Sequence, residues 1–251
     1  MPYTLPSYIN NQSQPSPVLR YIWNTDFVFK YDPEERIGKI RNTTTQTKIA
    51  LCIGVYEWII WRFHRLTNDA SPFQIAEAAW CGSVNNAYLK YFERDPDEYP
   101  GPVLDPLHSA MMSIGTVLSF TAENKDEWED GFGLILAPLA MHVLPDPQPF
   151  EKWLEYVTDR LLLLYPEPED DPYEDIFNDH EEERRGPLVA REALDPSFDY
   201  HPDQAPELLD NFLRNIDHMA NPFLRSPEEL MELGIEHPYR VLPPESPEWR
   251  K

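Results

Sequence analysis

The feature of this sequence that most constrains its fold is an apolar and aromatic stretch, Ile49–Leu66. One set of its side chains recurs at the three-and-four-residue spacing of a single helix face: Ile49, Ile53, Tyr56, Ile60 and Phe63. A second set widens that stripe: Leu51, Val55, Trp58, Ile59 and Leu66. A helix that is apolar on almost every side is a buried one. The stretch therefore predicts the central helix of a helical protein.

Six further helices are predicted from apolar periodicity and from helix start signals. They are expected at 71–92, from 105 onward, and at Glu127–Leu144, Phe150–Tyr165, Pro206–Met219 and Pro227–Leu233. The start signals are of two kinds. Ser71 and Ser226 are read as N-caps of capping boxes, each followed by a proline, whereas the third helix begins at Asp105-Pro106. Before the central helix, Val18–Trp23 and Phe27–Tyr31 suggest a short hairpin or an extended lead-in.

These elements predict an all-α fold, a single domain of about seven helices with an acidic loop and proline-rich termini. No repeat of fixed period and no alternation of strands with helices occurs in the sequence. Four parts are expected: a flexible N-terminal arm at 1–17, a main helical domain at 18–165, an acidic irregular loop at 166–200, and C-terminal helices and tail at 201–251 that pack on the main domain.

The charge of the chain excludes one class of partner. The sequence holds 21 Lys and Arg against 44 Asp and Glu, a net charge of −23. Such a surface repels phosphate backbones, so direct nucleic-acid binding is not expected. It attracts cationic partners, and it also keeps a protein soluble; both explanations of the charge stay open.

The compartment is expected to be the cytoplasm. The N-terminus lacks the basic and apolar regions of a secretory signal, and no apolar stretch has the length and purity of a membrane span. Cys52 and Cys81 are read as small buried hydrophobes, with a single bridge between their helices as the alternative.

No motif in the sequence identifies a catalytic, metal or cofactor site, and none is predicted. His64, His108 and His142 lie on separate helices without zinc-helix spacing. The four acids of 126–130 are explained by their place near a helix start, where carboxylates suit the helix dipole. No calcium-loop register, nucleophile elbow or glycine-rich phosphate loop is found.

The candidate binding site is the acidic stretch Pro166–Glu183, which contains no Lys or Arg. Like-charge blocks are usually solvated loops, and that explanation stays open here. Apolar side chains are interleaved with the acids, however, and an interface needs apolar anchors within an attractive field. The residues expected to contact a partner are Glu169, Asp170, Asp171, Tyr173, Glu174, Asp175 and Phe177.

In its overall profile, the chain resembles the immunity proteins of bacterial toxin systems, including those that guard against type VI secretion effectors. The likeness lies in the −23 charge, the 166–183 stretch and the lack of a catalytic signature, and no family motif assigns further residues. It implies a bacterial inhibitor that neutralises a basic toxin domain by direct contact. Two alternatives remain: an enzyme whose site is assembled from His108, His142, Asp126 and Glu127, or a structural or adaptor protein.

Overall fold

The computed structural model describes residues 3–9, 17–24, 38–122, 135–168 and 184–241. Within these ranges the protein has seven α-helices and no β-sheet, so the all-α prediction is confirmed. The helices are α2 (Thr45–Phe63), α3 (Ser71–Val84), α4 (Gly101–Ala122), α5 (Ala137–Val143), α6 (Gln148–Leu164), α8 (Ala205–Asn215) and α9 (Pro227–Glu232). Short 3-10 turns connect them: η3 (Ile40–Asn42), η4 (Asn86–Tyr88), η5 (Pro96–Glu98), η7 (Arg191–Leu194) and η8 (Pro202–Gln204).

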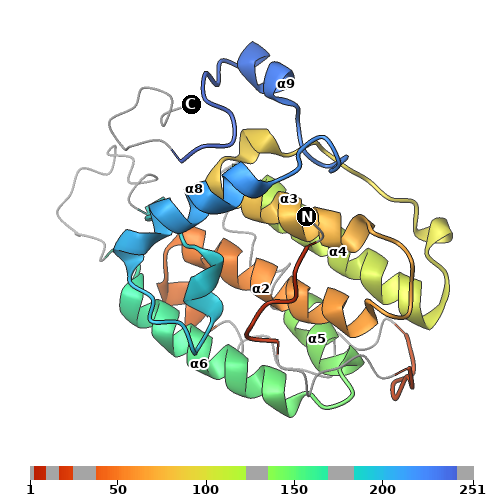
Figure 1. The fold of residues 1–251 in the computed structure, drawn as a ribbon. Coiled ribbons are helices and arrows are strands. Elements are labelled where there is room, and N and C mark those ends of the chain that lie inside the picture. Colours follow the sequence, from red (N-terminus) through yellow and green to blue (C-terminus); the bar gives the residue numbers. More distant parts are fainter. Residues whose placement is uncertain (1–2, 10–16, 25–37, 123–134, 169–183, 242–251) are drawn as a thin grey trace, which may run out of the picture.

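The central helix is α2, as predicted. It packs against α3, α4, α5 and α6, and Figure 1 shows it between α6 on one side and α3 with α4 on the other. All but two of its residues are buried. Gly54 makes one close approach possible, because a Cβ there would meet Leu194 Cδ1 at 2.6 Å and Trp153 at 3.2 Å. Burial on all sides explains why its sequence is apolar around the whole helix.

The charged residues of α2 are buried as well. Arg62 is 1% exposed and donates from Nε to the carbonyl of Val143 at 3.0 Å, and from Nη2 to the carbonyl of Val18 at 3.2 Å. Val143 is the last residue of α5, where carbonyl groups lack helical partners and a cation is favourable. Arg62 therefore joins α2 to α5 and to the N-terminal segment at 17–24.

The predicted second helix is shorter than its pattern suggested, which corrects both of its ends. Ser71 is the first helical residue and not the N-cap, and its N–H donates to the Asp69 carboxylate at 2.9 Å. The helix ends at Val84, eight residues before the predicted end at Phe92. Asn85 turns the chain, and the residues after it then run extended beside residues 223–225. This distant pairing competes with continuation of the helix.

The third helix begins earlier than predicted, at Gly101, so that Pro106 lies inside α4. A proline inside a helix lacks the N–H that would bond the carbonyl four residues before it. That carbonyl belongs to Pro102, and it accepts a hydrogen bond from the Tyr21 hydroxyl instead. A side chain from the N-terminal region therefore satisfies the group that Pro106 leaves free.

The remaining helices lie near their predicted places. Of the helix expected at Glu127–Leu144, residues 123–134 lie outside the described residues, and Pro138 stands in the first turn of α5. Helix α6 matches its prediction within two residues at its start and one at its end. Helix α8 ends at Asn215, four residues before the predicted Met219. The capping box of α9 is confirmed, with the Ser226 hydroxyl accepting from the Glu229 N–H at 3.2 Å.

Two segments expected to lie outside the helical body contribute to its core. From the predicted arm at 1–17, Tyr8 and Ile9 are buried, and the Tyr8 ring stacks on Trp153 with centroids 5.3 Å apart. From the predicted loop at 166–200, the buried residues are Leu188, Val189, Ala190, Ala193, Leu194, Asp195 and Tyr200. The described segment 17–24 contains no strand, and the second half of the predicted hairpin lies outside the described residues.

Cys52 and Cys81 are buried and free, which excludes the alternative of a bridge between them. Among the helices of the described residues, none combines the length and apolarity that crossing a membrane requires.

Candidate functional site

The seven residues predicted to contact a partner all lie within 169–183, outside the described residues. The chain on both sides of this range is described, however. We call 169–183 the acidic segment, and we call the residues that fix its two ends its base. The base lies at the N-terminal end of α2.

The chain entering the acidic segment is fixed by main-chain hydrogen bonds. The Thr44 N–H donates to the Tyr165 carbonyl at 3.2 Å, and the Glu167 N–H donates to the Asn42 carbonyl at 2.8 Å. Thr43 and Pro166 form an isolated antiparallel bridge between these two bonds. Residues 165–167 therefore lie as a short extended strip against the residues that precede α2.

The chain leaving the acidic segment returns to the same place. Gly186 has a φ of +72°, a left-handed conformation that favours glycine, and a Cβ there would lie 2.4 Å from the Cβ of Thr44. Thr44 is 3% exposed, and its hydroxyl lies 2.9 Å from that of Thr47. One buried residue, Thr44, thus contacts both ends of the base.

A buried tyrosine pair strengthens the base. The hydroxyls of Tyr165 and Tyr200 are 2.6 Å apart, and the Tyr200 oxygen accepts the Ala190 N–H at 3.4 Å. Both side chains are buried, and burial raises the pKa of each phenol above its usual value, so both stay protonated at neutral pH. The pair joins the residue before the acidic segment to the chain that follows it.

Beyond the base, the returning chain reaches a buried ion pair that was not predicted from the sequence. Arg191 Nη2 lies 2.8 Å from Glu57 Oε1, in the middle of α2. The Glu57 side chain is fully buried, and that of Arg191 is 21% exposed. Trp80 Nε1 donates to the same carboxylate oxygen at 3.1 Å, and the Tyr3 hydroxyl donates to it too. Four segments of the chain therefore meet at one oxygen atom.

The N-terminal segment covers this ion pair. The Arg191 guanidinium lies 4.7 Å from the centre of the Tyr3 ring and donates to the Thr4 carbonyl at 3.2 Å. The Ser7 hydroxyl donates to the carboxylate of Asp195, just after η7. Residues 3–9 are thereby held against the chain that returns from the acidic segment. No spacing in the sequence relates Glu57 to Arg191, so pattern analysis offers no signal for this pair.

Ionisation of the Glu57 carboxyl is disfavoured by its burial, even with Arg191 beside it. Burial raises the pKa of Glu57, although Arg191, Tyr3 and Trp80 each lower it, and Oε2 has no hydrogen-bond partner among the described residues. Burial lowers the pKa of Arg191, but the attraction of Glu57 outweighs it and the net shift is upward. When Glu57 is ionised, its buried charge therefore depends on Arg191 for compensation.

This arrangement predicts a pH dependence that Glu57→Gln should remove. The pKa of Glu57 is higher in the folded state than in the unfolded state. The contribution of Glu57 to the free energy of unfolding is therefore fully present at pH values below its unfolded-state pKa, and it declines as pH rises through its folded-state pKa. The stability of the wild type relative to Glu57→Gln should therefore fall as pH rises from about 4.5 toward 8, by up to about 1.4 kcal/mol per pH unit, until the folded-state pKa is passed. Urea unfolding across this range measures it. Glu207→Gln, on the exposed face of α8, is the control; a constant difference for Glu57→Gln would contradict the assignment.

His64 and the two histidines of the enzyme alternative, His108 and His142, each contact a different main-chain carbonyl. A ring nitrogen of His64 lies 3.1 Å from the Trp61 carbonyl, and one of His108 lies 3.0 Å from the Arg94 carbonyl. His142 Nε2 lies 3.0 Å from the Ile22 carbonyl, in the N-terminal region. Asp126 and Glu127 lie outside the described residues. Among the described residues, no three His, Cys, Asp or Glu side chains are grouped so as to hold a metal ion.

The comparisons with protein-family models, with curated proteins and with solved structures found no match for this chain.

Proposed function

We propose that this protein binds a basic protein domain through its acidic segment, and that it acts as a cytoplasmic immunity protein that neutralises a bacterial toxin or effector. The observation that carries the proposal is the base: Thr44 contacts the chain at both ends of the segment, through the Tyr165 carbonyl and through Gly186. The segment itself holds nine Asp and Glu and no Lys or Arg.

Fixed ends matter because binding must offset the entropy lost when a chain segment is ordered. A segment whose two ends are already held together by the fold has fewer conformations to lose than a free tail of the same length. Because both of its ends are fixed at the base, the chain also tethers the charges of the segment to this end of α2, where they can attract a cationic partner. The base therefore supports an interface at this end of α2 more than it supports a solubilising tail.

The composition of the segment supplies both parts of an interface. The acidic side chains, among them Glu169, Asp170 and Asp171, would attract a cationic surface over a distance of about a Debye length. Tyr173 and Phe177 would supply apolar anchors, the residue type that dominates binding energy in protein interfaces. A basic active-site surface, as in toxins that act on nucleic acids or nucleotides, is the matching partner.

Neutralising the acids should slow association. In a variant with Glu169, Asp170, Asp171, Glu174 and Asp175 changed to Gln or Asn, we expect the association rate constant at low salt to fall about 10- to 100-fold. Its dependence on salt should flatten as well, because steering by charge is what salt screens. Stopped-flow mixing with the basic partner recovered from native cells measures both quantities.

The matched control removes the same number of charges elsewhere. Changing the exposed acids Glu93, Asp97, Glu98, Glu207 and Glu232 to Gln or Asn alters net charge equally but leaves the acidic segment intact. This control should lose much less of its association rate. Equal losses in the two variants would assign the effect to net charge and remove the acidic segment from the account.

The two anchors should act on dissociation instead. Tyr173→Ala and Phe177→Ala should each raise the dissociation rate constant of the complex about 10- to 100-fold, because buried aromatic anchors contribute mainly after the encounter. The association rate constants should change little. Surface plasmon resonance separates the two; unchanged dissociation in both variants would show that these rings lie outside the interface.

A further inference from the structure

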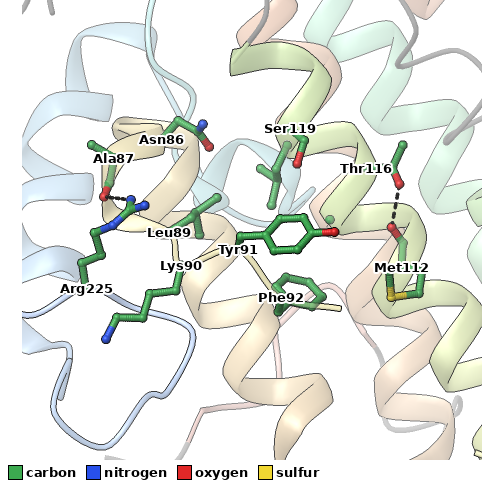
Figure 2. A pocket seen from close by; sticks show the side chains of 12 residues that line it. Asn86, Ala87, Leu89, Lys90, Tyr91, Phe92, Met112, Thr116, Ser119 and Arg225 are labelled. Carbon is green, nitrogen blue, oxygen red and sulfur yellow. Dashed lines mark hydrogen bonds between the residues drawn. The ribbon is translucent and has the colours of Figure 1, made fainter. Parts of the chain in front are cut away.

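A second surface, on the side of α4 and formed by residues other than those of the base, has the opposite electrostatic character. It is a groove of about 430 Å³ between α4 and the extended chain that follows η4. Its cationic wall is formed by Lys90 and Arg225, and among the described residues no Asp or Glu lines it, although the Glu229 and Glu93 carboxylates contact Lys90 and the Tyr91 hydroxyl at its rim. On a chain with a net charge of −23, a groove lined by two cations and no carboxylate is unusual. Figure 2 shows Lys90 and Arg225 on one side of it and Met112 and Thr116 of α4 on the other.

The floor of the groove is apolar. Leu89, Phe92 and Leu118 line it, and Figure 2 shows the Tyr91 ring lying across it toward α4. Gly115 leaves room for the Phe92 ring, because a Cβ on residue 115 would lie 3.0 Å from the end of that ring. The Tyr91 side chain is 81% exposed. An apolar floor, an exposed aromatic side chain and a few polar groups at the rim are typical of a surface that binds another chain.

The extended chain beside the groove is paired with residues 223–225 along one edge; on the other edge the Leu89 N–H donates to the Asn86 carbonyl at 3.0 Å, which leaves Tyr91 as the open position. The Lys90 N–H donates to the Phe223 carbonyl at 2.9 Å, and the Arg225 N–H donates to the Tyr88 carbonyl at 2.9 Å. Neighbouring residues in an extended chain direct their main-chain groups to opposite sides, so those of Tyr91 point away from Phe223. Within the described part of the chain, the N–H and carbonyl of Tyr91 make no hydrogen bond. An unpaired edge of this kind accepts an added strand.

The cations are held in place at the rim. Arg225 Nη1 donates to the Ala87 carbonyl at 2.7 Å, which uses one of the five N–H groups of its guanidinium. Lys90 Nζ lies 3.0 Å from the Glu229 carboxylate, whose capping contact with Ser226 fixes it at the start of α9. Glu229 lies within electrostatic reach of Arg225 as well as of Lys90, so at this rim two cations face one carboxylate and one positive charge remains in excess.

We propose that the groove binds an extended acidic peptide of a partner protein as an added strand. The peptide main chain would pair with Tyr91, an apolar side chain would enter the groove over Leu89 and Phe92, and an acidic side chain two positions away would reach Arg225. Residues two positions apart lie on the same face of a strand, which sets this spacing. The ligand is of opposite charge to the basic domain proposed for the acidic segment, so the two surfaces bind different partners and either proposal stands without the other.

A display experiment tests the proposal with a defined probe, a library of random heptapeptides. Peptides are selected on the full-length protein and counter-selected on Ser119→Trp, which places a large side chain into the groove from an exposed position on α4. Thr116→Trp is a second blocking variant from the same exposed helix face, and circular dichroism confirms that each is folded. We expect enriched peptides that carry an apolar and an acidic residue two positions apart.

Single substitutions then locate the contact by fluorescence anisotropy of an enriched peptide. Both Trp variants should weaken binding at least tenfold, Arg225→Gln should weaken it about three- to tenfold, and Leu163→Trp, on the exposed face of α6, should leave it unchanged. Binding that persists in both Trp variants, or enrichment of peptides without acidic residues, would overturn the proposal. Binding that appears only when residues 242–251 are deleted would also overturn it, because the peptide would then be competing with the chain's own C-terminus for the groove.

Discussion

Replacing Arg191 by Met is expected to destabilise this protein by about 3–5 kcal/mol, the range for removing one partner of a buried ion pair. The variant leaves the Glu57 carboxylate fully buried without the cation that compensates it. The Met side chain keeps much of the apolar volume of Arg191, so lost packing contributes little to this figure. The Thr4 carbonyl also loses its donor, and the N-terminal segment loses one of its attachments. Urea unfolding at pH 7.5, followed by circular dichroism, measures the loss.

Two comparisons separate the charge from other effects. Arg214→Met removes the partly exposed Arg214–Asp210 pair of α8 but leaves Asp210 paired with Arg240, and it should cost about 0.5 kcal/mol or less. Adding Glu57→Gln to Arg191→Met should recover part of the large loss, because an amide is less costly to bury than an uncompensated carboxylate. A cost for Arg191→Met no larger than that of Arg214→Met would show that the buried pair is not formed.

Replacing Gly186 by Ala is the second substitution with a large expected effect, about 2–4 kcal/mol. The new Cβ would meet Thr44 at 2.4 Å, and the positive φ of Gly186 disfavours any side chain. Thr44 cannot move away freely, since it is buried and its N–H holds the Tyr165 carbonyl at the other end of the base. The substitution should therefore separate the two ends of the acidic segment as well as lower the free energy of unfolding.

Gly101 supplies the matched control for this prediction. It too has a positive φ, of +88°, but no atom of the described residues lies within 4 Å of its expected Cβ. Gly101→Ala therefore reports the backbone strain alone, about 1 kcal/mol. The excess loss in Gly186→Ala, measured by urea unfolding, is the cost of the Thr44 contact. Equal losses in the two variants would mean that the base tolerates a side chain and that its ends are not tightly joined.

The parts of the fold that could be predicted from sequence are those set by local patterns. The all-round apolar pattern of Ile49–Leu66 identified the central helix, and the capping box of Ser226 and Glu229 placed the start of α9. Both signals are local: the residues that carry the pattern are the same residues that form the helix or its first turn. The all-α class followed from such signals alone.

The errors came from contacts between distant parts of the chain. The helix predicted to reach Phe92 ends at Val84 because the residues that follow pair with 223–225. Pro106 was read as a helix start, yet it lies inside α4, where the Tyr21 hydroxyl satisfies the carbonyl that it leaves free. In each case a tertiary partner outweighs the local preference.

The candidate sites show the same division. The acidic segment was found from its composition, whereas its base depends on Thr44 meeting Tyr165 and Gly186, which no local pattern encodes. Glu57 was visible only as an interruption of an apolar helix, and nothing near it in sequence indicates Arg191 as its partner. The groove beside α4 needs the chain after η4 and Arg225 to be brought together, so it too is a product of the fold.

The most direct test of the proposed function is a pull-down from native cells with three baits: the wild type, the variant with five neutralised acids in the acidic segment, and the variant with five neutralised acids elsewhere. Bound proteins are eluted with a salt gradient and identified by mass spectrometry. The account predicts one basic, stoichiometric partner that survives moderate salt on the first and third baits and is lost or elutes early from the second. Equal retention on all three baits, or self-association without a basic partner, would contradict it.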